Sequence, residues 1–150
     1  MRNSFRFSFA FFAAIHLALS LTASAQGYDQ AFVEGITEIT EVLKSEIARD
    51  EATTSANMTA GHLRQLRERL AVDLGRKEKN LAAIKRVKYP AIESAIRIIE
   101  DTFIAETQIA ADGRVNDVVQ TRAVRAIKDN LVKKKQSLAD IESWLKTNPF

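Results

Sequence analysis

Hydrophobic positions recur at helical spacing along most of the chain, most regularly in residues Asn116–Lys146. Seven positions there alternate in steps of three and four: Val124, Ile127, Leu131, Lys134, Leu138, Ile141 and Leu145. This alternation is the heptad seam of a coiled coil. Neither glycine nor proline interrupts it, so the pattern predicts a helix on the order of 45 Å long. Because a helix cannot bury a narrow seam by itself, partner helices are expected.

Three earlier segments carry the same kind of pattern and are predicted to supply those partners. Loop-forming residues separate the first from the second, Pro90 begins the third, and Asp112-Gly113 ends it. Thr59 and Asn116 are expected N-caps of the helices that follow them. The predicted helices are Asp29–Glu51, Ala60–Lys88, Pro90–Ala111 and Asn116–Lys146.

Two irregularities in the pattern predict local features. In the second helix the step from Leu70 through Leu74 to Leu81 departs from a heptad, which indicates a stutter around Gly75. The third helix has two neighbouring apolar stripes, one of them containing Ile98 and Ile109, so it is expected to be the most buried.

Four amphipathic helices with short polar connections predict an all-α fold, an antiparallel up-down four-helix bundle with coiled-coil packing. Three long helices with a kink at Pro90 are the alternative, because an apolar stripe continues through this proline almost in register. Charge favours sequential neighbours. Residues 28–58, 59–90, 91–112 and 113–150 have net charges of −5, +6, −4 and +4, so each adjacent pair is opposite in sign.

The N-terminus has the features of a secretory signal peptide rather than of a fold. Arg2 and Arg6 precede an apolar run over Phe7–Leu21, and Ala23-Ser24-Ala25 matches a cleavage pattern, so cleavage is predicted before Gln26. The run is short for a membrane span, and no stable membrane insertion is expected. The domains are therefore a signal peptide, 1–25, and one helical domain, 26–150. The predicted location is extracellular, or periplasmic if the source is bacterial.

Composition removes several classes of function. The chain contains no cysteine, which excludes disulfides, thiol catalysis and lipidation at a cysteine. Cleavage before Gln26 leaves 125 of the 150 residues, with 20 of the 22 basic side chains against 19 acidic ones. This near-neutral balance and the scarcity of aromatic residues argue against nucleic-acid binding.

No set of residues indicates catalysis, a cofactor or a metal. His62 is the one histidine after the signal peptide, and its pairing with Met58 supplies too few ligands for a metal site. Carboxylates such as Glu38, Glu41 and Glu100 lie off the apolar stripes, which indicates solvated helix faces rather than acid–base chemistry. The sequence therefore predicts a protein that is not an enzyme.

A few single residues remain as candidates for modification or binding. Asn57 begins an Asn-Met-Thr glycosylation sequon in a predicted loop. Lys134 lies in the seam, where it either extends to the rim, sets the register or lines a polar opening. Trp144 caps the end of the bundle or anchors a partner. Ile98 and Ile109 complete the candidate interaction or ligand-lining set.

These patterns favour an exported helical-bundle module that binds another protein or associates with itself. The alternative is a carrier of an apolar small molecule or lipid between the helices, suggested by the doubly apolar third helix.

Overall fold

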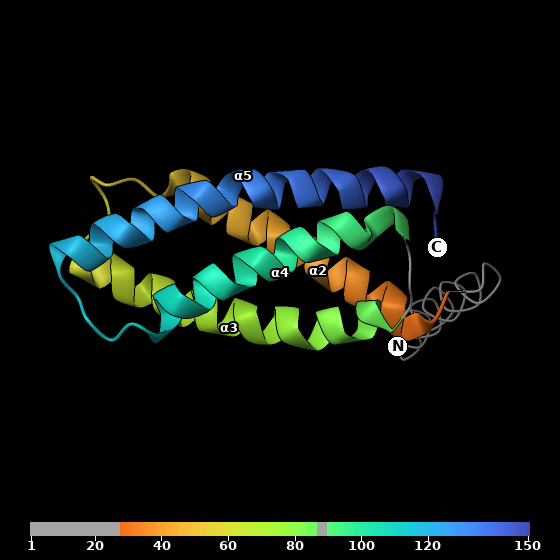
Figure 1. The fold of residues 1–150 in the computed structure, drawn as a ribbon, viewed down its shortest axis with the longest axis horizontal. Coiled ribbons are helices and arrows are strands. Elements are labelled where there is room, and N and C mark those ends of the chain that lie inside the picture. The colour runs from red at the N-terminus through yellow and green to blue at the C-terminus, as the bar shows by residue number, and fades with distance from the viewer. Residues whose placement is uncertain (1–27, 87–89) are drawn as a thin grey trace, which may run out of the picture.

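The computed structural model describes residues 28–86 and 90–150, and the predicted signal peptide lies outside these ranges. Four helices make up nearly all of this part of the chain (Figure 1). They are α2 (Gln30–Ala52), α3 (Ala60–Lys85), α4 (Pro90–Ala111) and α5 (Asp117–Thr147).

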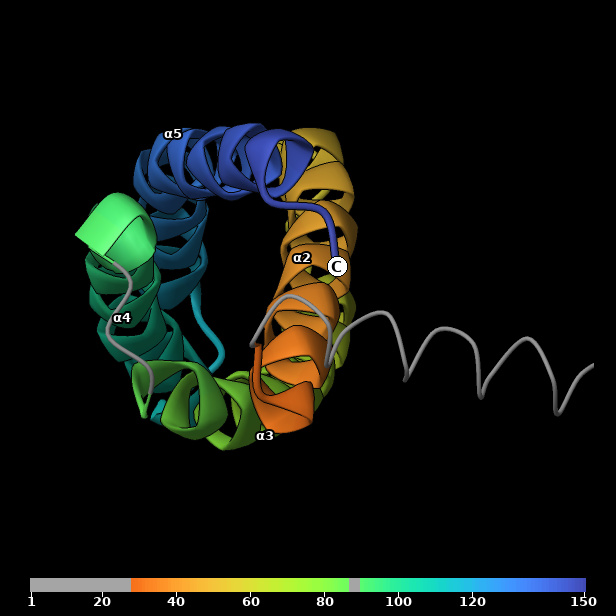
Figure 2. The same cartoon turned by 90° about the vertical axis from the view of Figure 1, so that its right-hand side faces the viewer.

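The helices form an antiparallel four-helix bundle, as the sequence predicts. Seen from the end, α2, α3, α4 and α5 stand at the corners of a square in chain order (Figure 2). Each helix packs against its neighbours in sequence, and α5 closes the square by packing against α2. Helix α3 ends at Lys85 and α4, which begins at Pro90, packs back against it, so the alternative of one kinked helix across Pro90 is wrong.

Local capping explains where the helices begin. The side chains of Asp29, Thr59 and Asn116 each accept a hydrogen bond from a backbone N–H in the first turn of α2, α3 and α5. Such caps satisfy donors that have no partner inside the helix. The predicted caps Thr59 and Asn116 are therefore confirmed.

The core consists of two separate apolar clusters. The terminal cluster lies at the end of the bundle where α2 begins and α5 ends. It contains Phe32, Ile36, Ile39, Leu43, Leu81, Ile84, Ile92, Ala95, Ile96, Ile99, Ile141 and Trp144. The loop cluster lies at the opposite end, beside the α2–α3 and α4–α5 connections. It contains Met58, Leu63, Leu66, Leu70, Ile109, Val119, Ala123, Val124 and Ile127.

Aromatic rings complete the terminal cluster. Tyr28 stacks on Phe32 at a centroid distance of 5.9 Å and meets Trp144 edge-on at 5.8 Å. The ring of Phe150 lies 5.5 Å from that of Tyr28, and the Tyr28 hydroxyl donates to Asn148 Oδ1 at 3.2 Å. The two ends of the described chain are thus joined by ring contacts of the kind that add stability beyond buried area.

Burial differs from the pattern-based expectation in two helices. Helix α2, rather than α4, is the most buried, with nine buried positions in 23 residues against seven in 22. Helix α4 is less buried than its apolar stripes predict, because Ile98 is half-buried and Ile104 is 60% exposed. On α5 the buried face is rotated from the predicted seam toward Asn130, Ser137 and Trp144. In a square bundle each helix packs against two neighbours. The face that it buries is therefore wider than the seam of a two-stranded coiled coil.

Glycine has a packing role at one position in the bundle. A Cβ added to Gly35 would lie 3.2 Å from both the Asn80 carbonyl oxygen and Ile84 Cγ1, so α2 and α3 approach closely there. Gly75, by contrast, is exposed, and an added Cβ would meet nothing within 4 Å.

Candidate functional site

Four charged side chains, one from each helix, lie buried between the two apolar clusters. They are Glu46 on α2, Lys77 on α3, Glu106 on α4 and Lys134 on α5, each at most 2% exposed. We call these four residues the charged ring. Going round the square the charges alternate in sign, so that each carboxylate stands diagonally opposite the other and each ammonium opposite the other.

Ion pairs join every adjacent couple of this ring. Lys77 Nζ lies 2.6 Å from Glu46 Oε2 and 2.6 Å from Glu106 Oε2. Lys134 Nζ lies 3.2 Å from Glu46 Oε2 and also pairs with Glu106 Oε1. All four helices are therefore connected electrostatically through the middle of the core, where charges that are removed from water require such partners.

Three further residues extend the ring toward the surface, and the seven together form the ion network. Lys134 Nζ donates to Asp50 Oδ2 at 2.7 Å, and Arg49 Nε donates to Asp50 Oδ1 at 3.3 Å. Arg49 Nη1 in turn donates to Asp73 Oδ2 on α3 at 2.7 Å. The network thus runs from the buried ring to a guanidinium that is 12% exposed.

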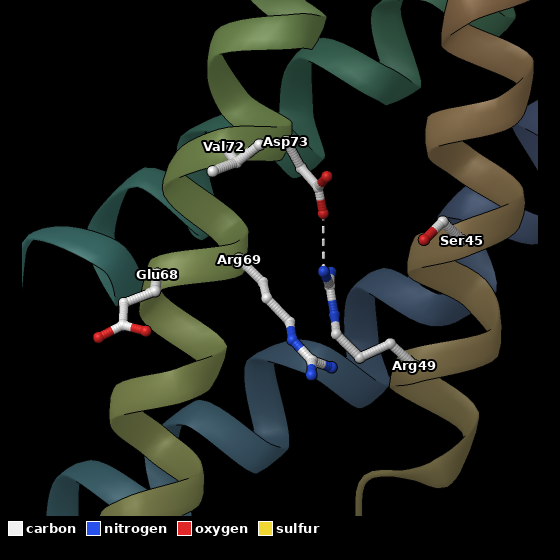
Figure 3. A pocket seen from close by; sticks show the side chains of 6 residues that line it. All are labelled: Ser45, Arg49, Glu68, Arg69, Val72 and Asp73. Atoms are coloured by element: carbon white, nitrogen blue, oxygen red, sulfur yellow. Dashed lines mark hydrogen bonds and ion pairs between the residues drawn. The ribbon is translucent and has the colours of Figure 1, made fainter.

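The outer end of the ion network opens into a surface pocket of about 440 Å³ between α2 and α3. Figure 3 shows the Arg49–Asp73 pair at this pocket, with the side chain of Arg69 extending into the same space from α3. The remaining lining residues are Ser45, Glu68 and Val72. The arrangement gives solvent a polar approach to the buried charges.

Burial and charge shift the acidities of the two ring glutamates in opposite directions. Burial, with the like charge of Glu106 across the ring, raises the pKa of Glu46 above the ordinary 4.5 despite the two lysines. Burial alone would also raise the pKa of Glu106, but Lys77 and Lys134 outweigh it and lower that pKa. Burial works against the charge of Lys134, yet Glu46, Glu106 and Asp50 raise its pKa above 10.5.

The heptad pattern places these charges inside the bundle. On α3 the buried positions run Leu63, Leu66, Leu70, Asp73, Lys77, Leu81 and Ile84, in steps of three or four residues. Two consecutive steps of four, from Asp73 to Lys77 and from Lys77 to Leu81, depart from the heptad beside Gly75. Leu74 is not one of the buried positions, because Asp73 and Lys77 occupy the core positions that the apolar pattern lacks. Glu46 and Asp50 continue the buried row of α2 in the same way, and Glu106 that of α4.

Sequence reasoning found one member of the ring and missed the others. Lys134 is visible in the sequence because it interrupts an apolar seam, but it is 1% exposed and does not extend to the rim. Glu46, Lys77 and Glu106 interrupt their own rows just as Lys134 does. The signal was present, but carboxylates are assigned by default to solvated faces.

The other predicted site residues do not lie together. Ile109 belongs to the loop cluster and Trp144 to the terminal cluster, while Ile98 is half-buried on α4. Trp144 is 8% exposed, which agrees with a cap on the end of the bundle rather than an exposed anchor. These residues therefore do not line a common cavity with Lys134.

Asn57 lies exposed in the α2–α3 connection, as expected for a sequon. Its Oδ1 accepts from the Thr54 backbone N–H at 2.8 Å, and its Nδ2 donates to the Ala52 carbonyl at 2.8 Å. The residue thus closes the turn between the two helices. Its glycosylation stays a prediction.

An open groove of about 390 Å³ runs between α3 and α4 on the outside of the bundle. Its apolar floor consists of Leu81, Ala82, Phe103 and Ile104, and its charged rim of Glu78, Lys85 and Glu100. Lys85 Nζ donates to Glu100 Oε1 at 2.6 Å across it. We call this feature the α3–α4 groove.

Within residues 28–86 and 90–150, no group of three or more acidic, histidine or cysteine side chains is arranged to hold a metal ion. None of the helices in those ranges is both long and apolar enough to cross a bilayer. Comparison with known proteins finds no matching family model, no similar curated protein and no similar solved structure.

Proposed function

We propose that this chain is an exported, non-enzymatic interaction module that binds a helical segment of another protein in the α3–α4 groove. The observation that carries the proposal is Ile104, a large apolar side chain that is 60% exposed at a groove with an apolar floor. A hydrophobic groove between two helices is the geometry in which amphipathic helices are commonly bound.

The charges around the groove define the kind of partner. Glu78 and Glu100 give the rim two carboxylates, and Lys85 is already paired with Glu100. Asp101, the next residue along α4, is exposed as well. Complementary charge favours a partner helix that carries Lys or Arg beside its apolar face.

The ion network supports this module over a carrier of an apolar ligand. A ligand between the helices would lie beside the buried Glu46, Lys77, Glu106 and Lys134, whose charges an apolar molecule cannot satisfy. The residues expected to line such a cavity also lie apart: Ile109 and Trp144 are in different clusters, Lys134 is in the network, and Ile98 is in none of these. These features favour the interaction module over the carrier.

Site-specific photocrosslinking tests the groove. A photoreactive residue is placed at position 104 or, as a matched control, at the apolar position Val132 on α5, which at 72% is at least as exposed as Ile104. In the fluid that the producing cells secrete, position 104 is expected to give one discrete adduct, to a basic amphipathic helix, and position 132 none.

Point variants separate binding from folding in the same assay. Ile104→Asp is expected to abolish binding of the crosslinked partner while the helical circular dichroism is unchanged, and Val132→Asp is expected to leave both unchanged. Equal adducts at the two positions, or binding that survives Ile104→Asp, would refute the groove as the site. An adduct with a second copy of the chain would mean that the groove serves self-association instead of binding another protein.

The proposed export is tested on the same material. The mass of the secreted chain under denaturing conditions is expected to correspond to cleavage before Gln26, and an additional carbohydrate mass on the peptide containing Asn57 would identify the sequon as used. A chain that retains residues 1–25 would exclude cleavage of a signal peptide.

A further inference from the structure

The centre of the ion network contains one negative charge more than it contains positive charges. Three carboxylates, Glu46, Asp50 and Glu106, face two ammonium groups, Lys77 and Lys134, and all five are at most 2% exposed. Arg49 and Asp73 form a pair of opposite charges at 2.7 Å and leave this difference unchanged. An uncompensated charge at such depth is costly, and a buried group commonly avoids that cost by becoming neutral.

Hydrogen bonding identifies the carboxylate that is held least well. Asp50 accepts hydrogen bonds on both oxygens, from Arg49 and from Lys134. Glu106 accepts one on Oε2, from Lys77 at 2.6 Å, while its Oε1 pairs with Lys134 without accepting a hydrogen bond. Glu46 accepts none on either oxygen: Lys77 lies within 2.6 Å of Oε2, but not at hydrogen-bonding angles.

The other carboxylate oxygen, Glu46 Oε1, is farther from any cation than Oε2 is. Its nearest recorded cation is Arg49 Nη2 at 4.0 Å, and that nitrogen also makes no hydrogen bond. An oxygen without a hydrogen-bond donor adds little to the stability of the ionised carboxylate. Glu46 is the group on which an added proton removes the excess charge at the least expense of existing bonds.

We propose that Glu46 is a proton-binding site, at which the ion network takes up one proton from solvent while the four helices stay packed. The carboxylate and a hydrated proton combine to give the neutral carboxylic acid and water. The proton approaches through the pocket at Arg49 and Asp73, the two partly exposed members of the network. This property is independent of the proposed partner binding.

The groups around Glu46 come from all four helices. Arg49 and Asp50 lie on its own helix, Lys77 on α3, Lys134 on α5 and Glu106 diagonally across on α4. Because the pKa of Glu46 is raised in the folded state, the folded protein binds this proton more tightly than the unfolded chain does. Its contribution to stability is therefore fully present below the unfolded value of 4.5 and is lost as pH rises through the folded pKa.

The test compares Glu46→Gln with Glu106→Gln in the protein purified from cells that express the full chain. Glutamine has the shape of a protonated glutamate, so each variant fixes one position of the ring in its neutral form. We expect Glu46→Gln to melt at a higher temperature than the parent at pH 8, by a margin that shrinks to zero as pH falls toward 4.5. Glu106→Gln is expected to melt at a lower temperature than the parent at pH 8, because it leaves Lys77 and Lys134 with one partner fewer.

Carboxyl ¹³C NMR of the parent protein supplies an independent measurement. One glutamate resonance is expected to titrate above 4.5, to disappear in Glu46→Gln and to remain in Glu106→Gln, while the backbone spectrum stays that of the folded protein. The proposal is overturned if the Glu46 resonance titrates at or below 4.5, or if both variants lower the melting temperature at pH 8 to the same extent.

Discussion

Replacing Lys134 by methionine isolates the contribution of one buried cation to the bundle. The ammonium group of Lys134 pairs with Glu46, Asp50 and Glu106, and its side chain is 1% exposed. Methionine has nearly the same length and is apolar, so the substitution removes the charge while it leaves little empty volume. Glu46 and Glu106 would then share Lys77 as their remaining ammonium partner, and Asp50 would keep only Arg49.

The expected loss follows from this imbalance. Removal of one partner from a buried ion pair typically costs about 3–5 kcal/mol, because the remaining charge is left without compensation. The entropy of unfolding is about 2.1 cal/mol/K per residue, so the roughly 120 described residues convert this loss into a fall in melting temperature of about 12–20 °C.

Urea unfolding followed by circular dichroism measures the loss directly, since the free energy extrapolates linearly to water. The matched control is Lys135→Met, one residue along α5. Lys135 pairs with Glu51 at 2.6 Å, but both side chains are about half exposed, so this variant is expected to cost less than about 1 kcal/mol. Equal losses in the two variants, or a loss below about 1 kcal/mol for Lys134→Met, would show that the buried ring does not have the stability role argued for it.

Further substitutions test the packing and capping of the helices, each by thermal unfolding. Gly35→Ala is expected to destabilise the fold by about 1–3 kcal/mol, because the added Cβ meets the backbone of α3. Gly75→Ala, with open space around it, is expected to stabilise the fold by about 0.5–1 kcal/mol. A reversed order of the two melting temperatures would contradict the close approach of α2 and α3. Asn116→Ala is expected to cost about 1 kcal/mol through loss of the α5 N-cap, and an unchanged melting temperature would mean that the cap contributes nothing. Ile99→Ala, at 1% exposure, is expected to cost about 2–5 kcal/mol and Val132→Ala, at 72%, less than about 0.5; similar values would place Ile99 outside the core.

The fold could be predicted because the residues that begin and end its helices act locally in the sequence. Pro90, Thr59 and Asn116 determine where helices begin through their own geometry or bonds to immediate neighbours in sequence, and these three starts agree with the structure to within about one residue, inside the usual uncertainty of helix limits. The end of α3 was predicted less well, because the helix stops at Lys85 rather than Lys88. Opposite net charges of successive segments likewise anticipated which helices are neighbours. Ion pairs occur between every adjacent couple of helices, such as Glu38 with Arg76 and Lys44 with Glu142.

The ion network could not be predicted in the same way, because its members are stabilised by partners far away in sequence. Lys134 and Asp50 are 84 residues apart, and Lys77 and Glu106 are 29 apart. Taken singly, each is a charged residue whose usual place is the surface. Only when all four interruptions are placed at the same height of an antiparallel bundle do their charges compensate one another.

The charged ring also limits what its own charges can specify. An alternating sequence of four charges on a square is unchanged when the square is reflected, so a bundle that turns clockwise and one that turns anticlockwise would bring the same residues side by side. The ring therefore selects the order of the helices but does not distinguish the two possible hands of the fold. Handedness must come from features that differ between an arrangement and its mirror image, such as the connections between helices, among them the turn that Asn57 closes. Electrostatic sorting and chiral selection are thus assigned to different residues of the same small protein.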